Sequence, residues 1–258
     1  MTAKKILVIG GTGHVSGAVA KLALSRGHQV WTLTRGIRPA MPGAIPIIVD
    51  RADSKALKIA IRKQNTVWDL VVDCICFNEP EMKLDIELFS SRAKQFVFVS
   101  TDFVYDPEKR KLPRPESGVT LEPGESELLS YGREKRACEL ELMKADTGVM
   151  SWTVFRPCHV YGPTSELGCL PPHGRDPKLI EKLRAGEPIR LVGGGYFLQQ
   201  PIMVSDLAES LLSVIGNSKS HNEIFNAAGP DIVESREYYQ IIADLLSVKL
   251  TVKEMSVQ

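Results

Sequence analysis

A glycine-rich segment near the start of the chain constrains the fold more than any other feature. Residues 6–9 (ILVI) have the pattern of a buried strand, and residues 10–17 (GGTGHVSG) lead into an amphipathic stretch ending near residue 26. Glycine has no Cβ, so backbone N–H groups in such a turn can approach a pyrophosphate at the following helix N-terminus. This order predicts a dinucleotide site. Ser16 takes the place of the third glycine of a GxGxxG spacing, and we expect a slightly shifted helix.

Short β-rich runs alternate with helical stretches through the first half of the chain. Nearly continuous apolar strands indicate burial on both faces, as in a parallel sheet. We expect an α/β fold, a Rossmann doubly wound sheet in residues 1–156, with a smaller, interleaved substrate-binding lobe in residues 157–258. The expected strands are 6–9, 30–34, 45–49, 68–75, 95–100 and 151–156, and the expected helices are 13–26, 53–63, 80–91, 128–144, 204–215 and 235–246.

Composition narrows the class of protein. The 258 residues carry a net charge of +1, so we expect neither a nucleic-acid partner nor an anionic membrane surface. No apolar run reaches the roughly 18 residues of a membrane span, and the first apolar run is too short for a signal peptide. The five cysteines include no CxxC pair, and the five histidines have no ligand spacing. These features favour a cytoplasmic protein with reduced thiols and no metal.

The residues after the second and third strands bear on cofactor choice. An acidic residue after the second strand would accept hydrogen bonds from the adenosine ribose, but Arg35 stands there. Because a guanidinium can pair with a 2′-phosphate, we favour NADP over NAD, with Arg38 as a second partner. The alternative is that Arg35 faces water or stacks on adenine, which leaves NAD open. After the third strand, Asp50 either accepts from the adenine amino group or belongs to the turn that leads to Asp53.

The sequence YGREK places Tyr131 and Lys135 one turn apart on one face of an expected helix. A nearby ammonium would favour the phenolate, so the tyrosine would act as an acid or base closer to neutral pH. Upstream, the fifth expected strand ends at Thr101, where α/β sheets bind ligands. Its hydroxyl is a candidate hydrogen-bond partner for a substrate oxygen beside Tyr131. These three residues form the candidate catalytic set.

Ordered motifs over nearly the whole chain resemble the extended short-chain dehydrogenase/reductase superfamily, in its NAD-dependent epimerase/dehydratase branch. The motifs are GGTGHVSG at 10–17, STDFVYD at 100–106, YGREK at 131–135, FRPCHVYGP at 155–163, PIRLVG at 188–193 and VSDLA at 204–208. The resemblance implies that Thr101, Tyr131 and Lys135 match the catalytic Ser/Thr-Tyr-Lys set. It implies an enzyme, and the family often forms homodimers through the helix that carries the tyrosine.

The resemblance also implies a wider set of site residues. Cys74 lies near the expected nicotinamide ribose, although small apolar packing is the interpretation that we favour for it. Asp102 is either a second acid or a turn cap, and His159 is either a substrate contact or a packed histidine. The residues expected to contact the dinucleotide are Gly10, Thr12, Gly13, His14, Val15, Arg35, Asp50, Arg51, Cys74, Ser100, Tyr131, Lys135 and Pro157.

Three departures from the family pattern bear on the substrate. Phe103 replaces the glutamate with which dehydratases assist elimination, His159 replaces an asparagine of many epimerases, and residues 198–202 (LQQPI) lack the arginine that clamps a diphosphate. The chain ends soon after residue 252. These features resemble shorter, atypical members, some of which are similar to chloroplast stem-loop RNA-binding proteins. We expect an epimerase or reductase acting on a sugar, sugar nucleotide or related carbonyl compound. The alternative is a non-catalytic dinucleotide-sensing or RNA-binding protein.

Overall fold

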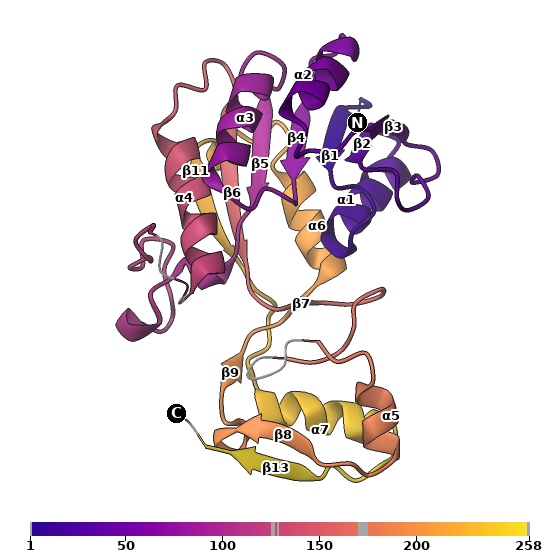
Figure 1. The fold of residues 1–258 in the computed structure, drawn as a ribbon, viewed down its shortest axis with the longest axis vertical. Coiled ribbons are helices and arrows are strands. Elements are labelled where there is room, and N and C mark those ends of the chain that lie inside the picture. Colours follow the sequence, from indigo (N-terminus) through magenta and orange to yellow (C-terminus); the bar gives the residue numbers. More distant parts are fainter. Residues whose placement is uncertain (1, 125–126, 128, 170–174, 257–258) are drawn as a thin grey trace. The chain divides into compact units, whose positions relative to one another are not determined.

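A computed structural model describes residues 2–124, 127, 129–169 and 175–256 (Figure 1). The chain forms two compact units that alternate along the sequence. The first contains Met1–Pro157 and Val204–Ala227, and the second contains Cys158–Met203 and Ala228–Gln258. The chain therefore leaves the first unit after residue 157 and returns to it for residues 204–227. The division into two domains at residue 156 stays a prediction.

The first unit is built on a seven-stranded sheet in which every strand pair is parallel. The strand order is β11-β6-β5-β4-β1-β2-β3. This order confirms the expected Rossmann doubly wound fold. The strands are β1 (Lys5–Ile9), β2 (Gln29–Thr34), β3 (Ile45–Ile48), β4 (Leu70–Asp73), β5 (Gln95–Val99), β6 (Ser151–Pro157) and β11 (Glu223–Ala227).

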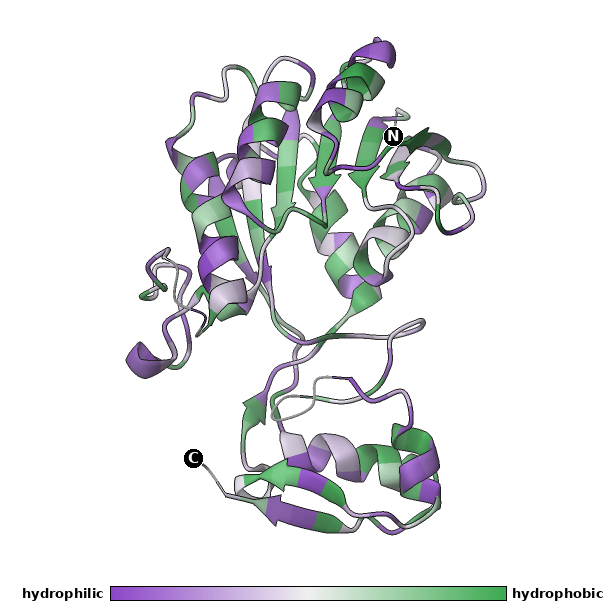
Figure 2. Ribbon diagram, in the orientation of Figure 1, coloured by the Kyte–Doolittle hydropathy of each residue, from purple (hydrophilic) through white to green (hydrophobic). Residues whose placement is uncertain are grey.

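Helices cover both faces of this sheet. One buried cluster joins the sheet to α2, α3 and α4, through residues such as Phe89, Phe96 and Leu142. Helices α1 and α6 pack on each other, and the residues of β1 alternate between the two faces, as a strand buried on both sides requires. Green apolar residues fill the strands in Figure 2. The helices are α1 (His14–Ser25), α2 (Ser54–Lys63), α3 (Glu79–Phe89), α4 (Ser130–Lys144) and α6 (Val204–Ser213).

Two strand assignments differ from the sequence-based expectation. Strand β4 covers Leu70–Asp73, shorter than the expected 68–75, because Asp73 ends the ladder and its carboxylate accepts the Ile75 N–H. Strand β11 was not expected. Its five residues include Glu223 and Asn226 and are mostly half-buried, so they lack the continuous apolar run that marks the central strands.

The second unit has its own small core. Helices α5 (Leu179–Arg184) and α7 (Ser235–Leu245) pack with β8 (Ile189–Val192), which pairs in parallel with β13 (Val252–Met255). Two further two-stranded pairs are β7 (Val160–Tyr161) with β10 (Ile202–Met203), and β9 (Leu198–Gln199) with β12 (Val233–Glu234). Over the part of the chain that the structure describes, no helix is long and apolar enough to cross a membrane.

Candidate functional site

The turn between β1 and α1 brings backbone close to the neighbouring strand. Gly10 and Gly11 have positive φ values of 115° and 55°, and a Cβ added to Gly11 would lie 2.5 Å from the Thr32 side chain. A residue other than glycine does not fit at position 11. Ser16 is buried, and its hydroxyl accepts the Gly13 N–H at 3.0 Å. Serine thus replaces the third glycine and also caps the start of α1.

A cavity of about 550 Å³ opens beside this turn. It lies at the carboxyl ends of β1 to β4, where open α/β sheets bind ligands. Glycines without a Cβ at its wall, together with the N-terminus of α1, fit a dinucleotide pyrophosphate. The expected cofactor residues that line it are Gly10, Thr12, Gly13, Arg35, Asp50 and Arg51, and those outside its lining are His14, Val15, Cys74, Ser100, Tyr131, Lys135 and Pro157.

Two arginines and a turn carboxylate line part of this cavity. Arg35 and Arg38 are both exposed on its wall, and the Arg38 guanidinium donates to the Thr12 carbonyl at 3.0 Å. One oxygen of Asp50 accepts the Ala52 N–H at 3.0 Å. Asp50 therefore takes part in the turn before α2, and its other oxygen has no hydrogen bond among the described contacts.

Tyr131 and Thr101 meet where β5 ends and α4 begins. The Thr101 hydroxyl accepts the Phe103 N–H at 3.2 Å and so caps the short 3₁₀ helix η1 (Asp102–Val104). The Tyr131 side chain is 43% exposed and lies edge-on to Phe103. Burial raises the pKa of Tyr131, a contact with the Thr101 hydroxyl opposes this, and the Asp102 charge adds to it. The phenol is therefore protonated at neutral pH.

Gly132 lets α4 approach η1 closely enough for this contact. A Cβ at Gly132 would lie 2.1 Å from the Phe103 carbonyl oxygen, which is backbone and cannot move aside locally. The glycine of the YGREK motif is thus required by packing. It holds Tyr131 next to Thr101 in the first turn of the helix.

Lys135 is oriented differently from the sequence-based expectation. Its side chain is only 1% exposed, and Nζ donates to the carbonyls of Cys76 at 2.8 Å and Val99 at 2.6 Å, above the Phe98 ring. Burial lowers the pKa of Lys135. We expected the ammonium to lower the pKa of Tyr131. In the arrangement seen here the ammonium is directed at two carbonyls and the tyrosine is partly desolvated, so the expected effect of Lys135 on Tyr131 stays a prediction.

Asp102 lies beside this pair and titrates unusually. Thr101 donates to its carboxylate at 3.4 Å, and burial raises the pKa of Asp102 to about 6, against the opposing charge of Arg114. A carboxyl with this pKa can hold or release a proton near neutral pH. The cap of η1 is the Thr101 hydroxyl and Asp102 is the first residue of that helix, so the expected turn-cap role belongs to Thr101 and the role of Asp102 as a second acid stays a prediction.

The raised pKa of Asp102 predicts a pH-dependent stability. The folded state holds this proton more tightly than the unfolded state, so the free energy of unfolding falls as the pH rises from about 4 to about 6. We expect Asp102→Asn to remove this fall and to stabilise the protein at pH 7 by about 1–3 kcal/mol. Urea unfolding at several pH values measures this difference. Asp106→Asn, a neighbouring turn cap, is the control, and equal pH slopes in both variants would contradict the prediction.

Ser100 takes part in a buried network on the other side of α4. Its hydroxyl donates to Glu139 at 2.6 Å, and the same carboxylate binds Arg156 through two hydrogen bonds of 2.9 and 2.7 Å and also binds Arg136. In this structure the Ser100 hydroxyl therefore donates its hydrogen bond to Glu139. Pro157, another expected cofactor residue, ends β6 opposite Ala227. Sequence reasoning did not identify this network.

Two further expected site residues have packed surroundings. Cys74 is half-buried after β4, and burial raises the pKa of its thiol. His159 belongs to the second unit, where its ring lies edge-on to Tyr238 at a centroid distance of 5.9 Å. Burial lowers the pKa of His159, and the Arg175 charge adds to this. A neutral, packed imidazole agrees with the structural alternative for this residue and does not test the substrate role.

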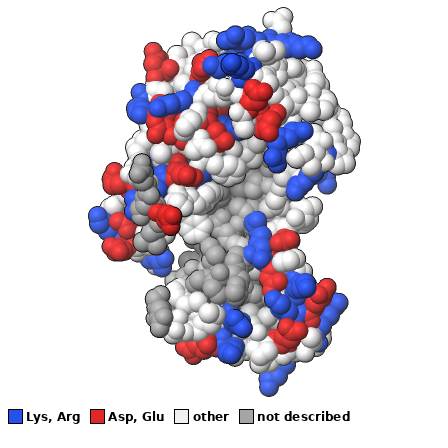
Figure 3. Space-filling view, viewed as in Figure 1, with Lys and Arg blue, Asp and Glu red and all other residues white. Residues whose placement is uncertain are grey.

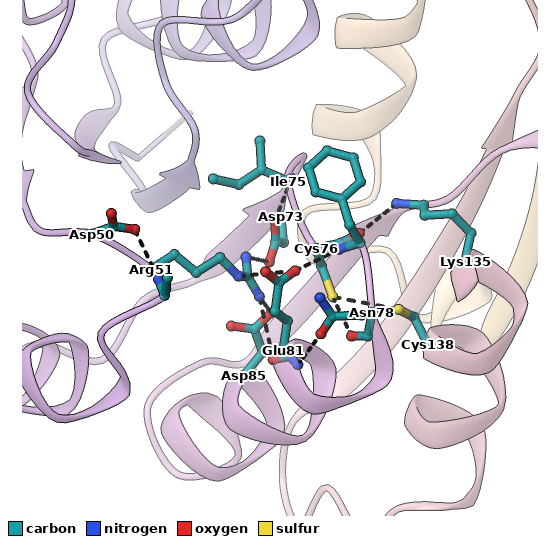
Figure 4. A network of polar contacts seen from close by, with 12 residues as sticks. Asp50, Arg51, Asp73, Ile75, Cys76, Asn78, Glu81, Asp85, Lys135 and Cys138 are labelled. Carbon is teal, nitrogen blue, oxygen red and sulfur yellow. Dashed lines mark hydrogen bonds and ion pairs between the residues drawn. The ribbon is translucent and has the colours of Figure 1, made fainter. Parts of the chain in front are cut away.

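Arg51 lines the cavity, but its guanidinium points into the protein (Figure 4). The side chain is 7% exposed and forms ion pairs with Asp73 at 2.5 Å and Asp85 at 2.6 Å. Asp73, Cys76 and Asp85 have ligand atoms within 4.8 Å of one another, but the guanidinium already supplies the cation between the two carboxylates. The sequence signals for this cluster were an aspartate ending an apolar strand and the Asp50-Arg51 pair.

Known proteins share both the sequence pattern and this architecture. Residues 82–228, more than half of the chain, match the family described as NAD dependent epimerase/dehydratase. The chain belongs to this family. The resemblance drawn from the motifs is thereby confirmed, and the matched segment contains Thr101, Tyr131 and Lys135.

The known proteins to which this chain is similar differ in their described roles. The chain is 29% identical over 245 residues to the chloroplast stem-loop binding protein of 41 kDa b from Arabidopsis thaliana, covering 89% of this chain and 60% of that protein. It is 24% identical over 264 residues to UDP-N-acetyl-alpha-D-glucosaminuronate decarboxylase from Bacillus cytotoxicus, covering 94% of this chain and 80% of that protein. UDP-glucose 4-epimerase of Thermotoga maritima, solved with UDP-glucose, superposes with a TM-score of 0.77 at 18% identity, covering 98% and 86% of the two chains.

Proposed function

We propose that this chain is an NAD(P)-dependent epimerase or reductase acting on a sugar, a sugar nucleotide or a related carbonyl or hydroxyl compound. One observation carries the proposal. Tyr131, Thr101 and the buried Lys135 lie on the unit that also forms the cavity beside the glycine turn. Membership of the NAD-dependent epimerase/dehydratase family supports the same chemistry.

The proposed roles follow from the state of each side chain. A bound nicotinamide dinucleotide supplies the hydride donor or acceptor. Tyr131 exchanges a proton through its phenol oxygen, and its raised pKa makes it a proton donor at neutral pH. Thr101 orients the oxygen that receives this proton. Lys135, released from its carbonyls, would contribute positive charge that eases proton loss from the phenol.

The preferred substrate class is a nucleotide sugar. The decarboxylase from Bacillus cytotoxicus is named for a UDP-sugar, and its match covers 94% of this chain. Phe103 stands where a dehydratase would carry a glutamate, so we propose redox or epimerase chemistry in preference to elimination of water. Asp102, with a pKa near 6, is the proposed substrate contact on the first unit. His159 lies in the second unit, and its role as a substrate residue stays a prediction.

We further propose that the dinucleotide is NADP, with NAD as the alternative that the family description supports directly. Arg35 and Arg38 give the cavity wall two exposed guanidinium groups. Replacing Arg35 by Glu removes one charge-assisted contact to a 2′-phosphate and adds repulsion, so the preference for NADP over NAD should fall by about 10–100-fold. Calorimetric titration with both dinucleotides measures the ratio. Arg62→Glu on the neighbouring helix α2 is the control, and an unchanged ratio in Arg35→Glu would exclude this role.

The direct test of the proposed function is to identify what the protein binds. Mass spectrometry of the ligand carried by the purified protein should detect NADP or NAD. Thermal unfolding with added NAD, NADP and UDP-sugars should then show a concentration-dependent rise in Tm for one dinucleotide, because a ligand that binds only the folded state stabilises it. An unchanged Tm with both dinucleotides would contradict the proposed function. The homodimer and the cytoplasmic location stay predictions.

A non-catalytic role in dinucleotide sensing or RNA binding is the second candidate. The observation that favours it is the similarity to a plant protein described as stem-loop binding. The face drawn in Figure 3 carries acidic side chains beside basic ones, which does not favour a polyanion. Nanomolar, salt-dependent binding of a stem-loop RNA without bound dinucleotide would favour this candidate over the enzyme.

A further inference from the structure

The segment that follows β4 is held from both sides by carboxylates (Figure 4). Asp73 accepts the Ile75 N–H at 2.7 Å, and Glu81, in the first turn of α3, accepts the Phe77 N–H at 2.7 Å. Between these two anchors, the Cys76 carbonyl accepts the Lys135 ammonium at 2.8 Å. The backbone of residues 75–77 is therefore fixed on either side of the oxygen that binds the lysine.

Arg51 joins the two anchoring carboxylates. Its guanidinium lies 2.5 Å from Asp73 and 3.5 Å from Glu81, and a third contact of 2.6 Å reaches Asp85. Although burial opposes it, the Arg51 charge holds the pKa of Asp73 below its usual range. Asp73 is thus an ionised acceptor for the Ile75 N–H. The buried Arg51 guanidinium thus contacts both carboxylates, Asp73 and Glu81, that hold residues 75–77.

The segment also covers the lysine on the cavity side. The Phe77 ring lies 5.4 Å from Lys135 Nζ, and Phe77 lines the 550 Å³ cavity. If residues 75–77 moved, the ammonium would keep the Val99 carbonyl but lose the Cys76 carbonyl. A buried ammonium that loses an acceptor becomes much less stable in that position. The Cys76 carbonyl of this segment is therefore one of two acceptors that hold Lys135 in its withdrawn position.

We propose that Arg51, Asp73 and Glu81 form a positioning cluster that sets the orientation of Lys135 through residues 75–77. The cluster acts on the lysine only through the Cys76 carbonyl and the Phe77 ring. The functional importance of this device rests on the proposed catalytic role of Lys135. The positioning of Lys135 by these residues does not depend on that role, because the orientation of the lysine can be measured without substrate or dinucleotide.

The test is competitive labelling of lysines with acetic anhydride, read for each peptide by mass spectrometry across a pH series. Wild-type Lys135 should label slowly. Glu81→Ala removes the Phe77 anchor, and loss of one hydrogen bond to a charged group should raise the labelling of Lys135 by about 10-fold or more. The same series gives the pKa of Lys135, which should rise towards that of a solvated lysine. Its charged and titratable neighbours are Asp73, Cys74, Cys76 and Cys138.

Two variants separate positioning from general destabilisation. Glu79→Ala removes an acidic residue from the same helical turn without touching residues 75–77, and Lys135 should label as in wild type. Glu81→Gln keeps an acceptor oxygen and should restore most of the protection. Equal labelling of Lys135 in Glu81→Ala and Glu79→Ala would overturn the proposal. If Glu81→Ala does not fold, hydrogen exchange in wild type decides: the Phe77 amide should be protected, and exchange at the rate of a free amide would overturn it.

These outcomes are distinct from those of the proposed function. If Lys135 responds as expected but no dinucleotide binds, the positioning cluster stands and the enzyme assignment fails. If a dinucleotide binds but Lys135 is labelled equally in wild type and in Glu81→Ala, the enzyme assignment stands and the proposed positioning cluster is wrong.

Discussion

Tyr131→Phe is expected to lower turnover by about 10²–10⁴-fold, the usual contribution of a positioned acid or base. The substitution removes only the phenol oxygen and keeps the ring that lies edge-on to Phe103. Because the substitution keeps the aromatic ring, dinucleotide affinity should change little. The loss should appear in kcat and kcat/KM together, since the missing interaction belongs to the reacting state.

The measurement uses the first UDP-sugar that the wild-type protein converts in the presence of NADP or NAD. Formation of the reduced or oxidised dinucleotide, or of the epimeric sugar, reports turnover. Tyr196→Phe, at an exposed tyrosine of the second unit, is the matched control and should retain wild-type rates. A Tyr131→Phe protein that binds the dinucleotide and converts the sugar at the wild-type rate would disprove the role of the phenol.

Local patterns predicted the fold and the glycine turn beside the 550 Å³ cavity. The strand–glycine–helix order at residues 6–26 depends on short-range sterics, such as the contact that any Cβ at Gly11 would make with Thr32. The central strands β1, β4 and β5 are buried almost throughout, so their continuous apolar composition revealed them. Strand β11 was missed for the opposite reason. It lies at the edge of the sheet beside β6, where half-buried polar residues are tolerated.

The sequence indicated which residues lie near the site better than it indicated where their side chains point. Helical spacing correctly set Tyr131 and Lys135 one turn apart, but where the ammonium points depends on two carbonyls from elsewhere in the chain, that of Val99 on β5 and that of Cys76 in the segment after β4. The orientation of the Arg51 side chain was likewise not predicted. It was expected at the dinucleotide, yet carboxylates from β4 and α3 draw its guanidinium inward. Long-range pairings of this kind leave no periodic signal in the sequence.

The second large effect concerns the stability of the first unit. Arg51→Met is expected to lower its free energy of unfolding at pH 7 by about 3–5 kcal/mol, because removing one partner of a buried ion pair leaves an uncompensated charge. Two fully buried carboxylates, Asp73 and Asp85, would lose their cation. Burial and the neighbouring Asp73 charge already raise the pKa of Asp85, so part of the penalty should be relieved by proton uptake.

Urea unfolding followed by tryptophan fluorescence measures this effect, since Trp31, Trp68 and Trp152 all lie in the first unit. Arg26→Met is the control: Arg26 pairs with Glu209 at the surface, and exposed pairs contribute only about 0–1 kcal/mol. Because the variant takes up protons that the wild type does not, its deficit should shrink as the pH falls towards 5. A deficit that is small, or that does not change with pH, would mean that Arg51 is not the cation that stabilises these carboxylates.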